Sequence, residues 1–179
     1  TDIENVEFIP ALMSLVTLDR VMGNRSGMGL ILKKALMSVQ DEYDYVLIDC
    51  PPILGVMMVN ALAASDRILI PVQTEFLAMK GLERMVRTLA IMQKSRPDPF
   101  KTTIVPTMYD KRTNASLQTL TQLKKGYPNQ VWPSAIPIDT KFRDASLKHL
   151  PASHFASGSR GVFAYKQLLL YLERLAFDD

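Results

Sequence analysis

Residues 64–85 read ASDRILIPVQTEFLAMKGLERM, and this stretch contains one strand and the start of one helix. The run from Arg67 to Val72 is short and aliphatic, as in a strand that is covered on both faces of its sheet. From Phe76 to Lys94, apolar side chains recur at helical spacing and charged residues occupy the opposite face. A buried strand followed at once by an amphipathic helix predicts a unit of a parallel α/β sheet.

The same alternation extends in both directions along the chain. Further strands are expected at Val6–Pro10, Tyr45–Ile48, Thr102–Thr107 and Val131–Ile138, and further helices at Ala11–Met22, Gly29–Val39, Val56–Ala64, Ala115–Lys125, Lys141–His149 and Gly161–Phe177. The connections are too long for hairpins, which predicts right-handed crossovers and a mainly parallel, doubly wound sheet. A chain of 179 residues, 47% of them hydrophobic, is expected to form a single domain over residues 1–179.

The composition excludes few functions. A net charge of +3 permits a nucleic-acid or acidic partner without requiring one. The single cysteine, Cys50, excludes an internal disulfide and suits the cytoplasm, and we interpret it as a small buried residue. No membrane span is expected. Neither His149 nor His154 has a second ligand at metal-binding spacing, so both are interpreted as loop residues.

Asp49 is the first candidate for chemistry. Residues 45–55 read YVLIDCPPILG, in which an apolar run ends at Asp49 and Pro51 and Pro52 prevent the strand from continuing. Asp49 is therefore expected at the carboxyl end of a buried strand, where open α/β sheets bind their ligands. It suits a Walker B acid that orients the water shell of Mg²⁺, but an ordinary turn or cap residue explains it equally well.

Several segments resemble a known family in order and wording. They are IDCPP at 48–52, ILGVMMVNAL at 53–62, residues 64–85, VPTMYDKRT at 105–113, AIPIDTKFRDAS at 135–146 and SRGVFAY at 159–165. Together they resemble the ParA/Soj/MinD family of deviant-Walker P-loop ATPases, whose wider class includes cobyrinic acid a,c-diamide synthase (the CobQ/CbiA-like nucleotide-binding domain). Within the family, the sequence is most similar to ParA-like ParC proteins of chemotaxis and flagellar gene clusters.

The resemblance implies ATP and Mg²⁺ as ligands and assigns roles to individual residues. Asp49 would order magnesium through water, and the segment from Pro51 to Asn60, shaped by Pro52 and Gly55, would sense the γ-phosphate. Glu75 would lie near the nucleotide and the dimer face. Residues expected around the adenine are Thr107, Met108, Arg112, Pro137 and Asp139. Core packing remains an alternative for Met108, and a plain surface charge remains one for Arg112.

One part of the family pattern is absent. The family's phosphate-binding loop is a glycine-rich turn with two lysines and a threonine, whereas GNRSGMG at 23–29 has neither the lysine nor a following hydroxyl. The resemblance therefore implies the C-terminal portion of a ParA-like ATPase domain, without its N-terminal strands and phosphate loop. Such a fragment is not expected to hydrolyse ATP, because phosphoryl transfer depends on that loop. Genuine loss of the loop is the alternative to truncation.

Three functions stay open at this point. The first is a ParA-like ATPase that positions a chromosome, a plasmid or polar chemotaxis arrays. It would form a homodimer with ATP, bind a ParB-like or polar protein partner, and act in the cytoplasm at the nucleoid or cell pole. The others are an ATP-dependent amide ligase and a non-catalytic interaction module. Basic residues that could contact DNA non-specifically, or merely be solvated, are Lys111, Lys124, Lys125, Lys141 and Arg143. The last helix is expected to pack on the domain and not in a lipid interface.

Overall fold

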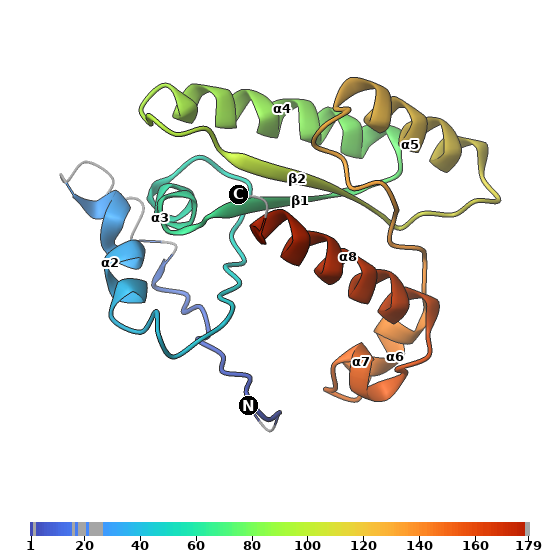
Figure 1. The fold of residues 1–179 in the computed structure, drawn as a ribbon, viewed down its shortest axis with the longest axis horizontal. Helices are drawn as coiled ribbons and strands as arrows, with labels where there is room; N and C mark the ends of the chain where they lie inside the picture. Colours follow the sequence, from blue (N-terminus) through green and yellow to red (C-terminus); the bar gives the residue numbers. More distant parts are fainter. Residues whose placement is uncertain (2, 16, 18–20, 22–26, 178–179) are drawn as a thin grey trace. The chain divides into compact units, whose positions relative to one another are not determined.

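A computed structural model describes residues 1, 3–15, 17, 21 and 27–177 of the chain (Figure 1). The described chain forms two compact units, Thr1–Asp66 and Arg67–Asp179. The second unit contains both strands that the structure assigns. None of the described helices is long and apolar enough to cross a membrane.

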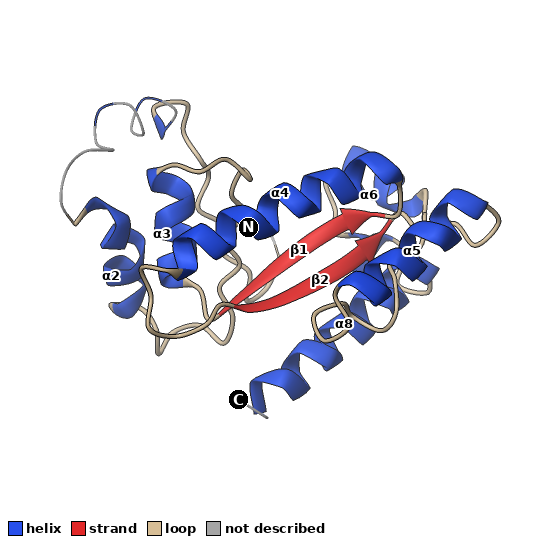
Figure 2. Ribbon diagram, turned by 90° about the horizontal axis from the view of Figure 1, so that it is seen from above, coloured by secondary structure: helices blue, strands red, loops and turns tan. Residues whose placement is uncertain are grey.

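Two parallel strands form the centre of the second unit. β1 (Arg67–Gln73) pairs with β2 (Lys101–Thr107), so that Arg67 lies opposite Lys101 and Gln73 opposite Thr107. Helix α4 (Phe76–Gln93) connects them, and Figure 2 shows it running alongside the two strands. Helix α5 (Asn114–Gly126) follows β2. The strand-helix-strand unit expected from residues 64–107 is therefore confirmed, with boundaries within one residue of the prediction.

The strand expected at Val131–Ile138 does not form as a continuous element. Only Val131 and Pro137 join β2 and its extension, as isolated parallel bridges to Ile104 and Tyr109. The segment stays close to β2, because the amide of Trp132 donates to the carbonyl of Ile104 at 2.9 Å. Prolines at 133 and 137 lack a backbone donor, which interrupts the ladder.

One hydrophobic cluster of this unit joins β2 to the last helix. Two short helices, α6 (Lys141–Leu147) and α7 (Ala152–Phe155), and one long helix, α8 (Arg160–Phe177), follow residue 140. Of these, α7 was not expected from the sequence. The core cluster consists of Val105, Trp132, Ile136, Ala164 and Leu168. Because α8 contributes two of these side chains, it packs on the unit as expected.

The first unit consists of short helices that contact one another. They are η1 (Met28–Leu30), α2 (Ile31–Met37) and α3 (Val56–Ala64). η1 approaches α3 closely, since a Cβ on Gly29 would lie 2.7 Å from Cγ1 of Val59. Helices were expected at 29–39 and 56–64, and both are confirmed. Of the helix expected at Ala11–Met22, residues 16, 18–20 and 22 lie outside the described residues, residues 15, 17 and 21 are helical, and residues 11–14 are not.

Two strands expected in the first unit are absent from the structure. Residues 6–10 and 45–50 have no regular secondary structure, and the side chain of Leu47 is 88% exposed. A strand needs a neighbour to bond its backbone groups, and no described strand pairs with either segment. The apolar pattern of residues 45–48 is thus present in the sequence, but the partner that would bury it is not found among the described strands.

Candidate functional site

The carboxyl ends of β1 and β2 meet a third segment at one edge of the sheet. After β1, the amide of Thr74 donates to the carbonyl of Thr107 at 3.0 Å. After β2, the amide of Tyr109 donates to the carbonyl of Ile136 at 3.0 Å, and the amide of Ile138 donates to Tyr109 at 3.1 Å. This is the edge where parallel α/β sheets bind ligands. It brings together Thr107, Met108 and Pro137, three of the residues expected around a base.

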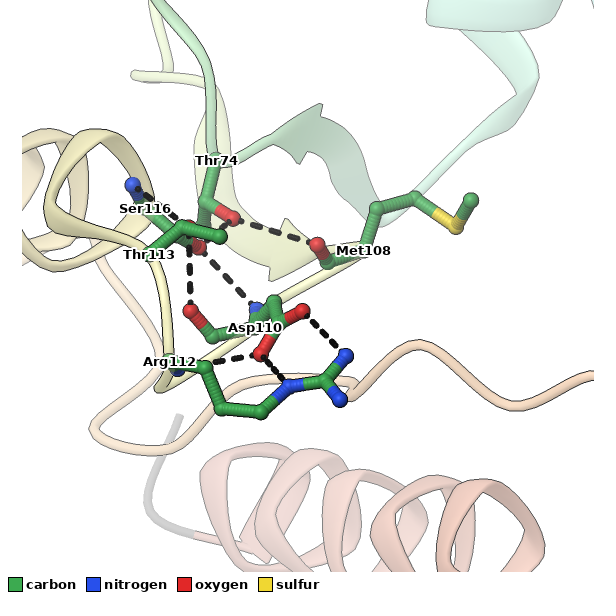
Figure 3. A network of polar contacts seen from close by, with 6 residues as sticks. All are labelled: Thr74, Met108, Asp110, Arg112, Thr113 and Ser116. Carbon is green, nitrogen blue, oxygen red and sulfur yellow. Dashed lines mark hydrogen bonds and ion pairs between the residues drawn. The ribbon is translucent and has the colours of Figure 1, made fainter.

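Met108 is held in an unusual conformation at this edge. Its φ is +52°, in the left-handed region that non-glycine residues rarely adopt. Its carbonyl accepts a long hydrogen bond of 3.4 Å from Oγ1 of Thr74 (Figure 3). The side chain is 44% exposed, so core packing does not explain it. Strained residues of this kind are enriched at functional sites, which supports a role for Met108 at the edge.

A buried hydroxyl pair connects the loop after β1 to the first turn of α5 (Figure 3). Oγ1 of Thr74 and Oγ of Ser116 lie 2.5 Å apart, and both residues are buried. The amide of Asp110 donates to Oγ of Ser116 at 3.1 Å. Thr113 caps α5 by accepting from the amide of Ser116. Because no buried side-chain polar atom in the described part of the chain lacks a partner, this network is fully satisfied and should be rigid.

Arg112 is oriented by Asp110. Nε and Nη2 of Arg112 donate to the two carboxylate oxygens of Asp110 at 2.9 and 2.7 Å, and the Arg112 amide donates to Oδ1 at 3.0 Å (Figure 3). These hydrogen bonds lower the pKa of Asp110 from 3.8 to about 2. Arg112 nevertheless remains 82% exposed. A bidentate pair presents the guanidinium in one fixed direction, which a free surface arginine would not do.

Asp139 directs its carboxylate to backbone donors. Oδ1 accepts from the amide of Lys141 at 3.0 Å, and Oδ2 accepts from the amide of Gly161 at 2.8 Å. The Gly161 hydrogen bond is the main reason that the pKa of Asp139 is lowered, and the Lys141 amide contributes further. The carboxylate is therefore ionised at neutral pH, and it holds the segment after Pro137 through these two backbone hydrogen bonds.

Glu75 lies at the start of α4 and is exposed. It occupies the position before the helix without capping it through its side chain, and its amide donates to the carbonyl of Gln73 at 2.8 Å. The next two residues, Phe76 and Leu77, are 66% and 74% exposed. An acid beside two exposed apolar side chains suits contact with another protein surface.

The remaining candidates belong to the first unit. Asp49, Pro51 and Pro52 are exposed in a segment without regular structure, and Gly55 directly precedes α3. Burial raises the pKa of the neighbouring Cys50 thiol, so it is not an activated nucleophile. These residues lie in Thr1–Asp66, whereas the residues expected around the adenine lie in Arg67–Asp179. That both groups meet around one nucleotide therefore stays a prediction.

The side chain of Asn60 is buried, and its amide group is fully hydrogen-bonded. Its Oδ1 accepts from the amide of Leu32 at 3.0 Å, and its Nδ2 donates to the carbonyls of Met28 and Val56 at 2.7 and 2.8 Å. The side chain therefore joins α3 to η1 and α2. Sequence reasoning assigned Asn60 to a phosphate sensor, whereas here both of its amide hydrogens are already used.

The described part of the chain forms no direct metal site, and the water-mediated role expected of Asp49 stays a prediction. Among the described residues, no three His, Cys, Asp or Glu side chains gather into a metal-binding group. Asp49 alone does not make a direct site, and the sequence contains no lysine-bearing phosphate loop. The loops after β1, after β2 and after Ile136 meet at what we call the base-side edge. This edge offers backbone groups and the exposed thioether of Met108.

The five basic residues named for DNA are exposed but do not belong to one element. Lys111 lies in the loop before α5, Lys124 and Lys125 lie near the end of α5, and Lys141 and Arg143 lie in α6. Lys124 Nζ donates to the carbonyl of Pro133 at 2.7 Å, and Lys141 pairs with Asp144 at 3.2 Å. A shared DNA-binding face remains a prediction.

The chain matches one family model and is similar to two Soj proteins. A family model described as AAA domain matches residues 1–102. The chain is 35% identical over 169 residues to the sporulation initiation inhibitor protein Soj of Bacillus subtilis, covering 94% of this chain and 67% of that protein. It is 32% identical to the chromosome-partitioning ATPase Soj of Treponema pallidum, with the same two coverages.

Solved structures show the same fold. Cobyrinic acid a,c-diamide synthase of Mycobacterium smegmatis, with bound ATP analogue and magnesium, superposes with a TM-score of 0.75 at 31% identity, over 92% of this chain and 61% of that one. A putative plasmid partition protein of Borrelia burgdorferi bound to AMPPNP superposes with a TM-score of 0.69 at 20% identity, over 93% and 64%. The chain thus spans about two thirds of the length of its relatives.

Proposed function

The chain belongs to the ParA/Soj family of P-loop ATPases, and from this premise we propose that it is the C-terminal portion of an ATPase domain that positions cellular cargo. Its α/β fold with a parallel sheet is of the P-loop NTPase type, as expected. The observation that carries the proposal is the meeting of three loops at the carboxyl edge of β1 and β2. In this proposal the two units are parts of one domain.

The base of ATP would lie against this edge. Thr107, Met108 and Pro137 would surround it, while Arg112, held by Asp110, would face its outer side. The short loops after β1 and β2 are held in place without a ligand, because Thr74, Ser116 and Thr113 form a satisfied network. A preorganised edge loses little conformational entropy on binding, which favours affinity.

The phosphate side would be completed by residues that this sequence does not contain. Asp49 would act on Mg²⁺ through water, as the acid that ends the YVLI run, and Pro51, Pro52 and Gly55 would form the adjoining turn. The bound ion would supply charge compensation for the phosphates. Asn60 would support that turn indirectly, by holding α3 to the neighbouring helices. No hydrolytic step is assigned to these residues.

Dimerisation would use the exposed start of α4. Glu75, Phe76 and Leu77 would contribute to a face that a second copy covers when ATP is bound. The partner would be a ParB-like or polar chemotaxis protein, with the nucleoid or the cell pole as the place of action. Non-specific DNA binding would use Lys111, Lys124, Lys125, Lys141 and Arg143, with affinity falling as salt rises.

The experiment measures the mass of the natural full-length protein by light scattering, with ATP or with ADP. We expect a dimer with ATP and a monomer with ADP. Glu75→Lys should weaken the ATP dimer by reversing a charge at the face, whereas the control Glu83→Lys should not change it. A mass that is the same with either nucleotide would contradict the proposal.

A second function is favoured by one observation. The Mycobacterium smegmatis structure, at 31% identity, carries the name of an amide-forming synthase. An amide ligase would consume ATP only together with a carboxylic acid and an ammonia source. Its usual glutaminase cysteine has no counterpart here, since Cys50 is the single cysteine and burial raises the pKa of its thiol. Turnover that depends strictly on ammonia would favour the ligase.

A further inference from the structure

One carboxylate ties the loop after Pro137 to the first turn of α8. Oδ2 of Asp139 accepts from the Gly161 amide at 2.8 Å, across 22 residues of sequence, while Oδ1 accepts from the Lys141 amide at 3.0 Å. Ser159 and Arg160 also favour the ionised carboxylate and lower its pKa further. The amides of a helix's first turn lack partners within the helix, so a carboxylate there is stabilised by both hydrogen bonding and the helix dipole.

Gly161 is also closely packed against side chains of the preceding segment. A Cβ on Gly161 would lie 2.2 Å from Cε2 of Phe142 and 3.1 Å from Cβ of Asp139. The Phe142 ring also lies 5.6 Å from the ring of Tyr165 on α8. The Phe142 ring of α6 therefore packs directly on Gly161 of α8, where a larger side chain would displace the ring.

We propose that Asp139 is a positioning residue, which does not contact the nucleotide but fixes residues 137–140 on α8 and so sets the base-side edge. This inference rests on the proposed function. It differs from the role that the sequence suggested, because both carboxylate oxygens point to backbone donors. Through this contact, the orientation of α8 governs the position of Pro137 beside Tyr109.

The first measurement is backbone amide hydrogen exchange without nucleotide, on Asp139→Asn. An asparagine retains one oxygen acceptor but presents an NH₂ group to the other backbone donor. We expect peptides covering 137–142 and 159–163 to exchange about three- to tenfold faster. Gly161→Ala should act in the same direction by separating α8 from Phe142. Asp144→Asn removes the same charge from an exposed pair on α6 and should leave both peptides unchanged. Unchanged exchange in Asp139→Asn would overturn the proposal.

The second measurement compares ATP with inorganic tripolyphosphate, which lacks a base, on the natural full-length protein. Asp139→Asn should weaken the binding of ATP about three- to tenfold and leave the binding of tripolyphosphate unchanged, because only the segment beside the base moves. Equal weakening of both ligands, or of neither, would overturn the positioning role while leaving the proposed function intact. A wild-type protein that binds no ATP would overturn the proposed function together with this inference.

Discussion

Asp110 and Arg112 form the best-defined charged contact at the base-side edge. The guanidinium donates two hydrogen bonds to the carboxylate, and the Arg112 amide donates a third. These contacts favour the ionised acid in the folded state. Because the folded pKa, about 2, lies below the ordinary value of 3.8, the contribution of Asp110 to stability is complete above that value and is lost as the pH falls towards 2.

Replacing Asp110 with Asn should therefore lower the melting temperature in a pH-dependent way. The difference between wild type and Asp110→Asn should be largest above pH 4 and should shrink as the pH falls through about 2. Thermal unfolding followed by circular dichroism at a series of pH values measures it. Asp144→Asn, in an exposed ion pair, is the control and should change the melting temperature little at any pH. A difference that is constant from pH 6 to pH 2 would contradict this account of the pair.

The sequence indicated individual residues better than their contacts. Arg112 could be named from the wording of the chain, but Asp110 was missed, although its spacing of two residues from Arg112 was a readable signal. Asp139 could be named as well. Its partner Gly161 could not, because the contact joins residues 22 apart and depends on how α8 packs. Long-range contacts of this kind are decided by tertiary structure and leave no local pattern.

At the scale of elements, Asn60 holds α3 to η1 and α2. Asn60→Ala would leave the Leu32 amide and the Met28 carbonyl without their partner in a partly buried place. We expect the free energy of unfolding of this unit to fall by about 1–3 kcal/mol. Denaturant unfolding followed by exchange at residues 28–37 and 56–64 measures the change. The same substitution at the exposed Asn114 should have little effect, and equal effects at both positions would contradict the assignment.

Local periodicity predicted most helices and both strands of the pair, since amphipathic spacing and short aliphatic runs depend only on nearby residues. It failed at 6–10, 45–48 and 131–138, where strand formation depends on a neighbour. Residues 131–138 have a neighbour, β2, but prolines interrupt the pairing. Residues 45–48 have none among the described strands, and Leu47 stays exposed. An apolar run therefore predicts the tendency to form a strand, not the presence of its partner.

For the whole molecule, the base-side edge and Asp49 lie in different compact units, Arg67–Asp179 and Thr1–Asp66. The chain also spans about two thirds of the length of its curated relatives. The single domain expected from the sequence stays a prediction, as does the convergence of both halves of the site around one nucleotide. Family membership and the parallel fold, in contrast, could be predicted from the wording and order of the segments and are confirmed.

The central claim is that the loops after β1 and β2 and after Ile136 form the base side of an ATP site. Photolabelling of the natural full-length protein with 8-azido-ATP, followed by peptide mapping, tests it most directly. We predict that the label attaches within residues 107–112 and 136–141, and that excess ATP prevents it. Attachment elsewhere, or labelling that ATP does not reduce, would contradict the claim.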